Sequence, residues 1–122
     1  MKAESRIQIR PKRLADASED YNWQSDPELS RLDATSALTI PFRQYLAEYA
    51  YELSYPTVNR FEFAIETLDG IHIGNCVYYN INRRERKAEL GIMIGDRRYW
   101  NKGYGTEAIN ILLKHIFEHT DL

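Results

Sequence analysis

The residues best suited to chemistry lie in one segment, 97–108, where two glycines and several basic side chains come together. Gly103 and Gly105 lack a Cβ atom, so the backbone there can turn sharply and approach an anion closely. An amphipathic pattern begins near Gly105, so the segment leads into a helix whose first N–H groups have no intrahelical partner. The cationic side chains of the segment are Arg97, Arg98 and Lys102. We therefore predict a pyrophosphate-binding loop at this helix entrance.

Two other phosphate-binding patterns compete with this prediction, and a plain helix cap is a third interpretation. The Walker A pattern G-x-x-x-x-G-K-[ST] does not occur in the sequence. The dinucleotide pattern G-x-G-x-x-G/A matches residues 103–108, but it requires a βαβ unit in which the strand leads directly into the first glycine. The preceding strand is expected to end near Gly95, which leaves a long connector. A nicotinamide-dependent oxidoreductase is therefore the more remote alternative.

The remaining nucleophiles and metal ligands lack the partners that their chemistry requires. Cys76 is the single cysteine, so an internal disulfide is excluded, and we expect a small buried side chain rather than a nucleophile. His115 and His119 are one helical turn apart, but no H-E-x-x-H pattern accompanies them, and His72 has no partner motif. We expect no metal site.

The spacing of apolar residues predicts the elements that position the loop. The predicted strands are 5–10, 61–66, 71–81 and 88–95, and the predicted helices are 15–25, 41–55 and 105–119. We expect Asp26-Pro27 to end the first helix and Pro41 to be the first helical residue of the second. Short connections make 61–95 an antiparallel meander. The order β-α-α-β-β-β-α predicts one α/β (α+β) domain over residues 1–122, with a mixed, mainly antiparallel sheet flanked by helices.

Composition and charge exclude several classes of protein. The formal net charge of the 122 residues is −2, which gives no electrostatic reason to expect nucleic acid as a partner. The first ten residues lack the apolar segment of a signal peptide, and no stretch approaches the length of a membrane span. We expect a cytoplasmic protein that binds neither nucleic acid nor membranes. A homo-oligomer is compatible with these features.

The segments 88–95 (AELGIMIG) and 99–108 (YWNKGYGTEA) resemble the GNAT superfamily of acyl-CoA N-acyltransferases. The chain looks closest to the branch that contains ribosomal-protein N-terminal acetyltransferases and spermidine acetyltransferases, and Trp23 with residues 26–28 resembles that branch more loosely. The order of elements agrees with the family over the whole chain. The resemblance implies a GNAT-like fold, acetyl-CoA as the cosubstrate and an amine as the acceptor.

The resemblance also implies a role for each part of these segments. The backbone of strand 88–95 pairs with the pantetheine arm, and one of its N–H groups polarises the thioester carbonyl and stabilises the oxyanion. The backbone of residues 101–106 holds the pyrophosphate, and the amine attacks the acetyl group without an acetyl-enzyme. The residues expected to bind the cosubstrate, from the loop chemistry and the resemblance together, are Ile92, Met93, Ile94, Arg97, Arg98, Asn101, Lys102, Gly103, Tyr104, Gly105 and Thr106.

Glu89 is the candidate general base. On an extended strand its side chain shares a face with Met93, opposite Leu90 and Ile92, and the resembling branch often has a glutamate at this point. A carboxylate can accept the ammonium proton directly or through a water. The alternative is a solvated charge that pairs with a basic residue of the preceding turn, Arg86 or Lys87.

The N-terminal helices offer candidate contacts for the acceptor. The resemblance implies that the first two helices flank the acceptor cleft, which makes Tyr21 and Trp23 candidates. Four acidic residues would attract a cationic amine, although a solvated helix face is the commoner explanation of such a cluster. They are Glu19, Asp20, Asp26 and Glu28.

Two departures from the family pattern bear on activity. Trp100 stands where the family usually has Arg or Gln, three residues before the first glycine, although the resembling branch often has an aromatic residue there. The family continues with a fifth strand and a helix that carries an Asn and a Tyr, so the resemblance places the general acid beyond Leu122. We therefore expect that the chain is a fragment, that another chain completes the cleft, or that the domain is inactive alone. Strand 88–95 would then be an exposed edge.

The prediction from the sequence is an N-acetyltransferase that moves an acetyl group from acetyl-CoA to a primary amine. The expected acceptor is a peptide N-terminus or a polyamine-like small molecule. A CoA-binding or interaction module without catalysis is the alternative.

Overall fold

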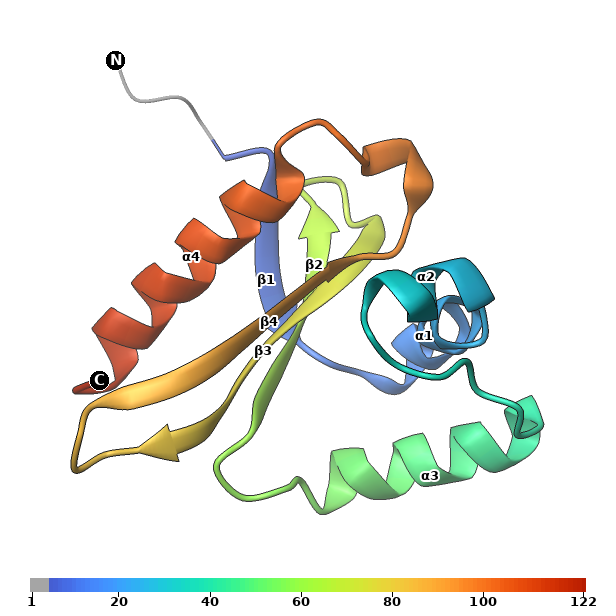
Figure 1. The fold of residues 1–122 in the computed structure, drawn as a ribbon, viewed down its shortest axis with the longest axis horizontal. Helices are drawn as coiled ribbons and strands as arrows, with labels where there is room; N and C mark the ends of the chain where they lie inside the picture. Colours follow the sequence, from blue (N-terminus) through green and yellow to red (C-terminus); the bar gives the residue numbers. More distant parts are fainter. Residues whose placement is uncertain (1–4) are drawn as a thin grey trace. The chain divides into compact units, whose positions relative to one another are not determined.

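The computed structural model describes residues 5–122, which form two compact units (Figure 1). The first, which we call the sheet unit, joins the N-terminal segment up to Pro11 to Val58–Leu122. The second, the helical unit, is Lys12–Thr57. The elements in chain order are β1 (Ile7–Pro11), the 3₁₀ turn η1 (Leu14–Asp16), α1 (Ala17–Gln24), α2 (Pro27–Leu32), α3 (Phe42–Ser54), β2 (Phe61–Thr67), β3 (His72–Asn82), β4 (Lys87–Ile94), the 3₁₀ turn η2 (Arg97–Tyr99) and α4 (Tyr104–His119).

The sheet unit contains one four-stranded sheet in the order β1-β2-β3-β4, and each neighbouring pair is antiparallel. Short turns connect β2 to β3 and β3 to β4. Gly70, with φ of 90°, supplies the left-handed conformation of the first turn, and its N–H donates to the Thr67 carbonyl at 2.9 Å. The meander predicted over 61–95 is confirmed.

Helix α4 packs against β1, β3 and β4 on one face of the sheet (Figure 1). The strand register brings Phe63 opposite Cys76, and Cys76 opposite Ile92, so apolar side chains from successive strands share this face. Leu112 of α4 is fully buried, which stabilises the unit by about 1.5–3 kcal/mol. The buried core consists of Ile7, Ile65, Ile73, Cys76, Tyr78, Ala108, Leu112 and Ile116.

The helical unit contains a helix that the sequence analysis missed. Asp26-Pro27 does end α1, but it also begins α2. Oδ1 of Asp26 accepts hydrogen bonds from the N–H groups of Glu28 at 2.9 Å and Leu29 at 3.3 Å. Pro27 fits the first helical position because its missing N–H would have no partner there. The dipeptide is therefore a helix start as well as a stop, and the predicted order lacked this element.

The prediction for Pro41 was wrong by one position. Pro41 has ψ of 150° and is the N-cap of α3, and the helix begins at Phe42. The Pro41 carbonyl accepts the first helical hydrogen bond, from the Tyr45 N–H at 3.1 Å. An N-cap residue contributes its carbonyl while its own backbone stays extended, so proline fits there too.

Aromatic rings and one buried ionic group hold the helical unit together. The Tyr21 ring lies 5.2 Å from the rings of both Phe42 and Tyr45, which joins α1 to α3. Asp20 is 1% exposed and accepts hydrogen bonds from the Lys12 ammonium and from the Tyr49 hydroxyl, the latter at 2.7 Å. Burial, and then the hydrogen bond to Asp20, raise the pKa of Tyr49 far above its ordinary value.

The α/β fold class with an antiparallel sheet and helices is confirmed. Over residues 5–122, none of the helices combines the length and the apolar character needed to cross a bilayer. A cytoplasmic location and a homo-oligomer stay predictions.

Candidate active site

Strand β4 has a hydrogen-bonding partner on one side only among the described strands, because it ends the order β1-β2-β3-β4. Alternate N–H and C=O groups along its other side therefore point away from the sheet. Ile92 and Ile94 pack against the core beneath α4, whereas Met93 belongs to the opposite face. The predicted edge at 88–95 is thus present, with the alternation that the sequence indicated.

A glycine of β3 sets how closely the end of β4 approaches, and the sequence analysis did not single it out. Gly74 lies opposite Ile94, and a Cβ atom on it would stand 2.1 Å from the Met93 carbonyl oxygen. Any side chain there would push the Met93–Ile94 backbone away. The signal in the sequence was a glycine inside a strand, which is typical of a close backbone approach.

The loop after β4 is fastened to the sheet at two points. The N–H groups of Gly95 and Asp96 both donate to the Ile73 carbonyl, at 2.9 and 3.1 Å. The Trp100 indole Nε1–H donates to the Ile94 carbonyl at 2.7 Å. Trp100, the departure from the family pattern, therefore positions the loop and ties it back to the last residue of β4.

The entrance of α4 has the geometry that the glycines predicted. Gly103 is the N-cap and has φ of 82°, a left-handed conformation that favours glycine. The Gly103 carbonyl accepts from the Glu107 N–H at 3.1 Å, so the N–H groups of Tyr104, Gly105 and Thr106 precede the first helical hydrogen bond. A Cβ atom on Gly105 would have no other atom within 4 Å, so the space above this turn is open.

Two of the three basic side chains near the entrance contact neighbouring groups of the same loop. The Arg98 guanidinium donates to both carboxylate oxygens of Asp96, at 3.0 and 2.7 Å, and these bonds hold the Asp96 pKa below its ordinary value. The Arg97 guanidinium lies 5.3 Å from the centroid of the Trp100 ring. Lys102 is exposed. Asp96 therefore offsets part of the positive charge that the sequence suggested.

Asn101 and Tyr104 complete the predicted loop. Asn101 has φ of 58°, so the backbone turns through a second left-handed residue two positions before Gly103. The Tyr104 ring packs edge-on against Tyr99, with centroids 5.2 Å apart. The Thr106 side chain is exposed. The loop thus combines two left-handed positions with packed aromatic rings, which hold the helix entrance in a defined shape.

One cation at this entrance could not be identified from the local pattern. Arg6, just before β1, pairs with Glu107 of α4: its backbone N–H donates at 2.6 Å and its Nε at 2.9 Å to the two carboxylate oxygens. The Arg6 guanidinium also lies 4.0 Å from the centroid of the Tyr104 ring. A hundred residues separate the partners in sequence, so only the fold brings this charge to the first turn of α4.

Glu89 is exposed on β4, on the face away from α4, where Asn80 of β3 donates a hydrogen bond to its carboxylate. The alternative partner from the sequence, Lys87, instead lies 3.4 Å from Glu85. Ile94 is five positions after Glu89 on an extended strand, about 17 Å away at 3.3–3.4 Å per residue. Glu89 and the glycine loop are thus at opposite ends of β4, and the predicted thioester segment lies between them.

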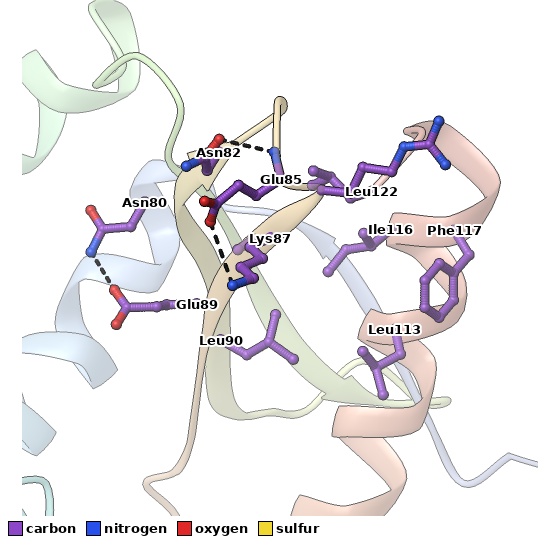
Figure 2. A pocket seen from close by; sticks show the side chains of 12 residues that line it. Asn80, Asn82, Glu85, Lys87, Glu89, Leu90, Leu113, Ile116, Phe117 and Leu122 are labelled. Carbon is purple, nitrogen blue, oxygen red and sulfur yellow. Dashed lines mark hydrogen bonds and ion pairs between the residues drawn. The ribbon is translucent and has the colours of Figure 1, made fainter.

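A groove of about 650 Å³ lies beside Glu89, between the β3–β4 hairpin and the C-terminal half of α4 (Figure 2). Figure 2 shows Leu113, Ile116 and Phe117 of α4 on one side and the polar residues of the hairpin on the other. The groove does not include the glycine loop. Its lining residues are Asn80, Asn82, Glu85, Arg86, Lys87, Ala88, Glu89, Leu90, Leu113, Ile116, Phe117 and Leu122.

The other candidate centres have structural explanations. Cys76 is 1% exposed in the core, which confirms the buried side chain expected from the sequence. The His115 ring packs edge-on against Phe63, and the His119 ring stacks on the His115 ring with centroids 4.3 Å apart. Burial, followed by the neighbouring His119, lowers the His115 pKa. Within residues 5–122, no cluster of three or more His, Cys, Asp or Glu side chains is arranged to hold a metal ion.

The acidic cluster predicted at the first helices is not a set of four available charges. Asp20 is buried with Lys12 and Tyr49, and Asp26 caps α2. Tyr21 donates its hydroxyl proton to the Ile40 carbonyl at 2.6 Å. Three of the proposed acceptor contacts therefore have structural roles inside the helical unit. The partners Ile40 of Tyr21 and Tyr49 of Asp20 are distant in sequence, so the local pattern did not reveal them.

Residues 6–122 match the family model for the acetyltransferase (GNAT) domain, and the chain belongs to that family. It is 28% identical over 119 residues to the uncharacterised N-acetyltransferase p20 of Bacillus licheniformis, a match that covers 96% of this chain and 66% of that protein. The chain thus spans just under two thirds of the length of this relative. The antiparallel strands agree with this assignment and not with the βαβ context of a dinucleotide-binding fold.

Solved structures share the fold. The spermidine N-acetyltransferase of Vibrio cholerae, in complex with CoA and spermine, has a TM-score of 0.79 at 20% identity, with 95% of this chain and 66% of that chain covered. The aminoglycoside acetyltransferase AAC(6')-Ib, in complex with ribostamycin and coenzyme A, has a TM-score of 0.68 at 14% identity, with 94% and 69% covered.

Proposed function

We propose that this protein transfers an acetyl group from acetyl-CoA to a primary amine. The observation that carries the proposal is the continuous path formed by the open edge of β4, the fastened loop and the glycine-rich entrance of α4, in a chain that belongs to the GNAT family. The path lies entirely within the sheet unit. The CoA bound by two similar structures supports acetyl-CoA as the cosubstrate.

Different groups along β4 and at the start of α4 would bind the cosubstrate and accept the proton. The N–H groups at the start of α4, between Gly103 and Thr106, carry partial positive charge and suit a pyrophosphate. The outward backbone of Ile92–Ile94 would pair with the extended pantetheine arm, and an N–H there would stabilise negative charge on the thioester oxygen. Glu89, held by Asn80, would take a proton from the acceptor's ammonium group, and the neutral amine that results would attack the acetyl carbonyl carbon.

The acceptor in this proposal is an amine that carries positive charge. Similar structures contain spermine and ribostamycin, and their proteins are named for spermidine and aminoglycosides. A polyamine-like small molecule is therefore favoured over a peptide N-terminus. The thiolate released from acetyl-CoA would take its proton from a general acid or from solvent.

Two measurements test the proposal. Acetyl-CoA should raise the melting temperature of the chain, by an amount that grows with the logarithm of its concentration, and NADH should not. Thiol release from acetyl-CoA should then require an added amine. A rise in melting temperature without thiol release from any amine would favour the CoA-binding module, and no response to acetyl-CoA would contradict the proposal.

A further inference from the structure

One row of side chains crosses the face of the sheet that carries Glu89. The register places Tyr79 of β3 opposite Glu89 of β4, and Glu62 of β2 opposite Val77, two residues from Tyr79. Directly opposed residues, and residues two apart along a strand, point to the same face. Glu89, Tyr79 and Glu62 therefore share one surface on three adjacent strands.

A cation already occupies part of this surface. The Arg60 guanidinium lies 5.3 Å from the centroid of the Tyr79 ring, within the range of cation–π contact. Its Nε and Nη2 also donate to one carboxylate oxygen of Glu62, at 3.1 and 2.8 Å. The Tyr79 ring of β3 and the Glu62 carboxylate of β2 together thus hold a positive group on the face of the sheet that carries Glu89.

The position of Arg60 makes this cation easy to displace. Arg60 precedes β2 and its side chain is 40% exposed, and the Glu62 side chain is 44% exposed. An ion pair this exposed contributes little net stability, since water solvates both partners when they separate. A second cation could therefore replace the guanidinium at small cost.

The spacing suits an acceptor with two amino groups. Neighbouring strands lie about 4.8 Å apart and residues rise about 3.3–3.4 Å along a strand, so Tyr79 is one strand from Glu89, and the Glu62 backbone, two strands across and two residues along, is about 12 Å from that of Glu89. An extended di- or polyamine spans this interval when one nitrogen lies at Glu89, because both glutamate side chains shorten the gap. A monoamine placed at Glu89 would not reach Glu62.

We propose that Tyr79 and Glu62 form a subsite for the second, non-reacting ammonium of a di- or polyamine acceptor, and that Arg60 competes for this subsite from within the chain. The inference rests on the proposed function, because Glu89 is the point from which the reacting amine is placed. It assigns these three residues to acceptor selectivity. Arg60 lowers the affinity for diamines, and Tyr79 and Glu62 raise it.

The test compares spermidine with n-butylamine as acceptors and uses three variants: Arg60→Gln, Tyr79→Leu and Glu62→Gln. Arg60→Gln should lower the KM for spermidine, whereas Tyr79→Leu and Glu62→Gln should raise it. Each change should be roughly two- to fivefold, the size expected of one exposed cation–π or ionic contact. The KM for n-butylamine and the kcat for both amines should change little. Arg84→Gln, in the exposed β3–β4 turn, is the matched control for loss of one positive charge.

A direct binding measurement separates this inference from the proposed function. Spermidine should shift the NMR signals of the Tyr79 ring in the wild-type chain, whether or not acetyl transfer occurs. In Arg60→Gln the same shift should appear at a lower spermidine concentration. Acetyl transfer with the same spermidine preference in all variants would overturn the subsite and leave the enzyme assignment intact. Spermidine binding without thiol release would support the subsite and count against the enzyme. Absence of both Tyr79 shifts and altered KM values would overturn the inference.

Discussion

Gly103 and Gly105 are two residues apart, but different physical constraints act on them. Gly103 has φ of 82°, so any other residue there would strain the backbone as well as change the surface of the loop. Gly105 is the second residue of α4 and has ordinary helical backbone, and a Cβ atom on it would meet open space. Gly105 is therefore the position at which ligand binding can be tested without strain.

Gly105→Ala should separate stability from binding. The free energy of unfolding should stay the same or rise by up to about 1 kcal/mol, because alanine loses less backbone entropy in a helix than glycine does. The affinity for CoA should fall several-fold, since the new methyl group would stand where the phosphate approaches. Urea denaturation and isothermal titration calorimetry measure the two quantities. Asn110→Ala, on the exposed surface of α4, is the control; equal CoA affinity in wild type and Gly105→Ala would contradict the pyrophosphate site.

Glu89→Gln should lower the kcat of acetyl transfer by about 10²-fold, because an amide cannot take the ammonium proton. Gln can still accept the hydrogen bond from Asn80, so the local geometry is preserved. The affinity for CoA should not change, because the loop lies at the other end of β4. Steady-state kinetics with an amine acceptor measure the effect. Glu85→Gln, another exposed carboxylate of the same hairpin, should behave as wild type, and an unchanged kcat in Glu89→Gln would exclude Glu89 as the base.

At the scale of elements, different contacts hold the two ends of α4: an ion pair at the first turn and aromatic stacking near the last turns. Its first turn is tied to the start of β1 by Arg6 and Glu107, whose side chains are 2.8 Å apart. Near its other end, His115 lies against the aromatic rings of Phe63 in β2 and Tyr78 in β3, and the His119 ring stacks on the His115 ring. The first contact holds the helix entrance near the predicted phosphate site, and the second makes the packing of the helix sensitive to pH.

The lowered pKa of His115 predicts a stability that falls in acid. The unfolded chain takes up a proton near the ordinary pKa of 6.5, before the folded chain does. The contribution of His115 is therefore complete above that value and is lost as the pH falls through the lower folded pKa. Urea denaturation between pH 8 and pH 5 measures this slope, and His115→Phe should reduce it while keeping the contact with Phe63. If stability changes equally with pH in wild type and in His115→Phe, groups other than His115 cause the change. His119→Gln measures how much of the pH dependence comes from the effect of His119 on His115.

At the scale of the whole molecule, the two units are stabilised by different means. The sheet unit has an apolar core between α4 and the sheet. The helical unit has fewer buried aliphatic side chains, and the buried carboxylate of Asp20 joins the segment at Lys12 to α1 and α3. The stability of the helical unit therefore depends strongly on one polar contact.

Asp20→Asn should destabilise the helical unit by about 3–5 kcal/mol, because it leaves the partly buried Lys12 ammonium without a compensating charge. Hydrogen exchange should show the loss of amide protection within residues 12–57. Glu19→Gln, on the exposed side of the same helix, should have little effect. Amide protection in Asp20→Asn equal to that of wild type would disprove the structural role of this carboxylate.

Sequence patterns that extend over many residues predicted much of the sheet unit. Periodicity and backbone sterics act locally, and they account for the antiparallel meander, the final helix α4, the glycine at the entrance of α4 and the buried Cys76. The helix at 27–32 was missed because it is only six residues long and its start, Asp26-Pro27, is also typical of a helix end.

The amino-acid sequence by itself determined the order of strands in the meander, the glycine-rich entrance of α4 and the membership in the acetyltransferase family. Only the tertiary structure decided which charges meet. Arg6 pairs with Glu107, Arg60 lies on the Tyr79 ring, and Asp20 accepts a hydrogen bond from Tyr49, because contacts between distant segments depend on strand register and helix packing. Charges act through space, so their spacing along the chain does not reveal their partners.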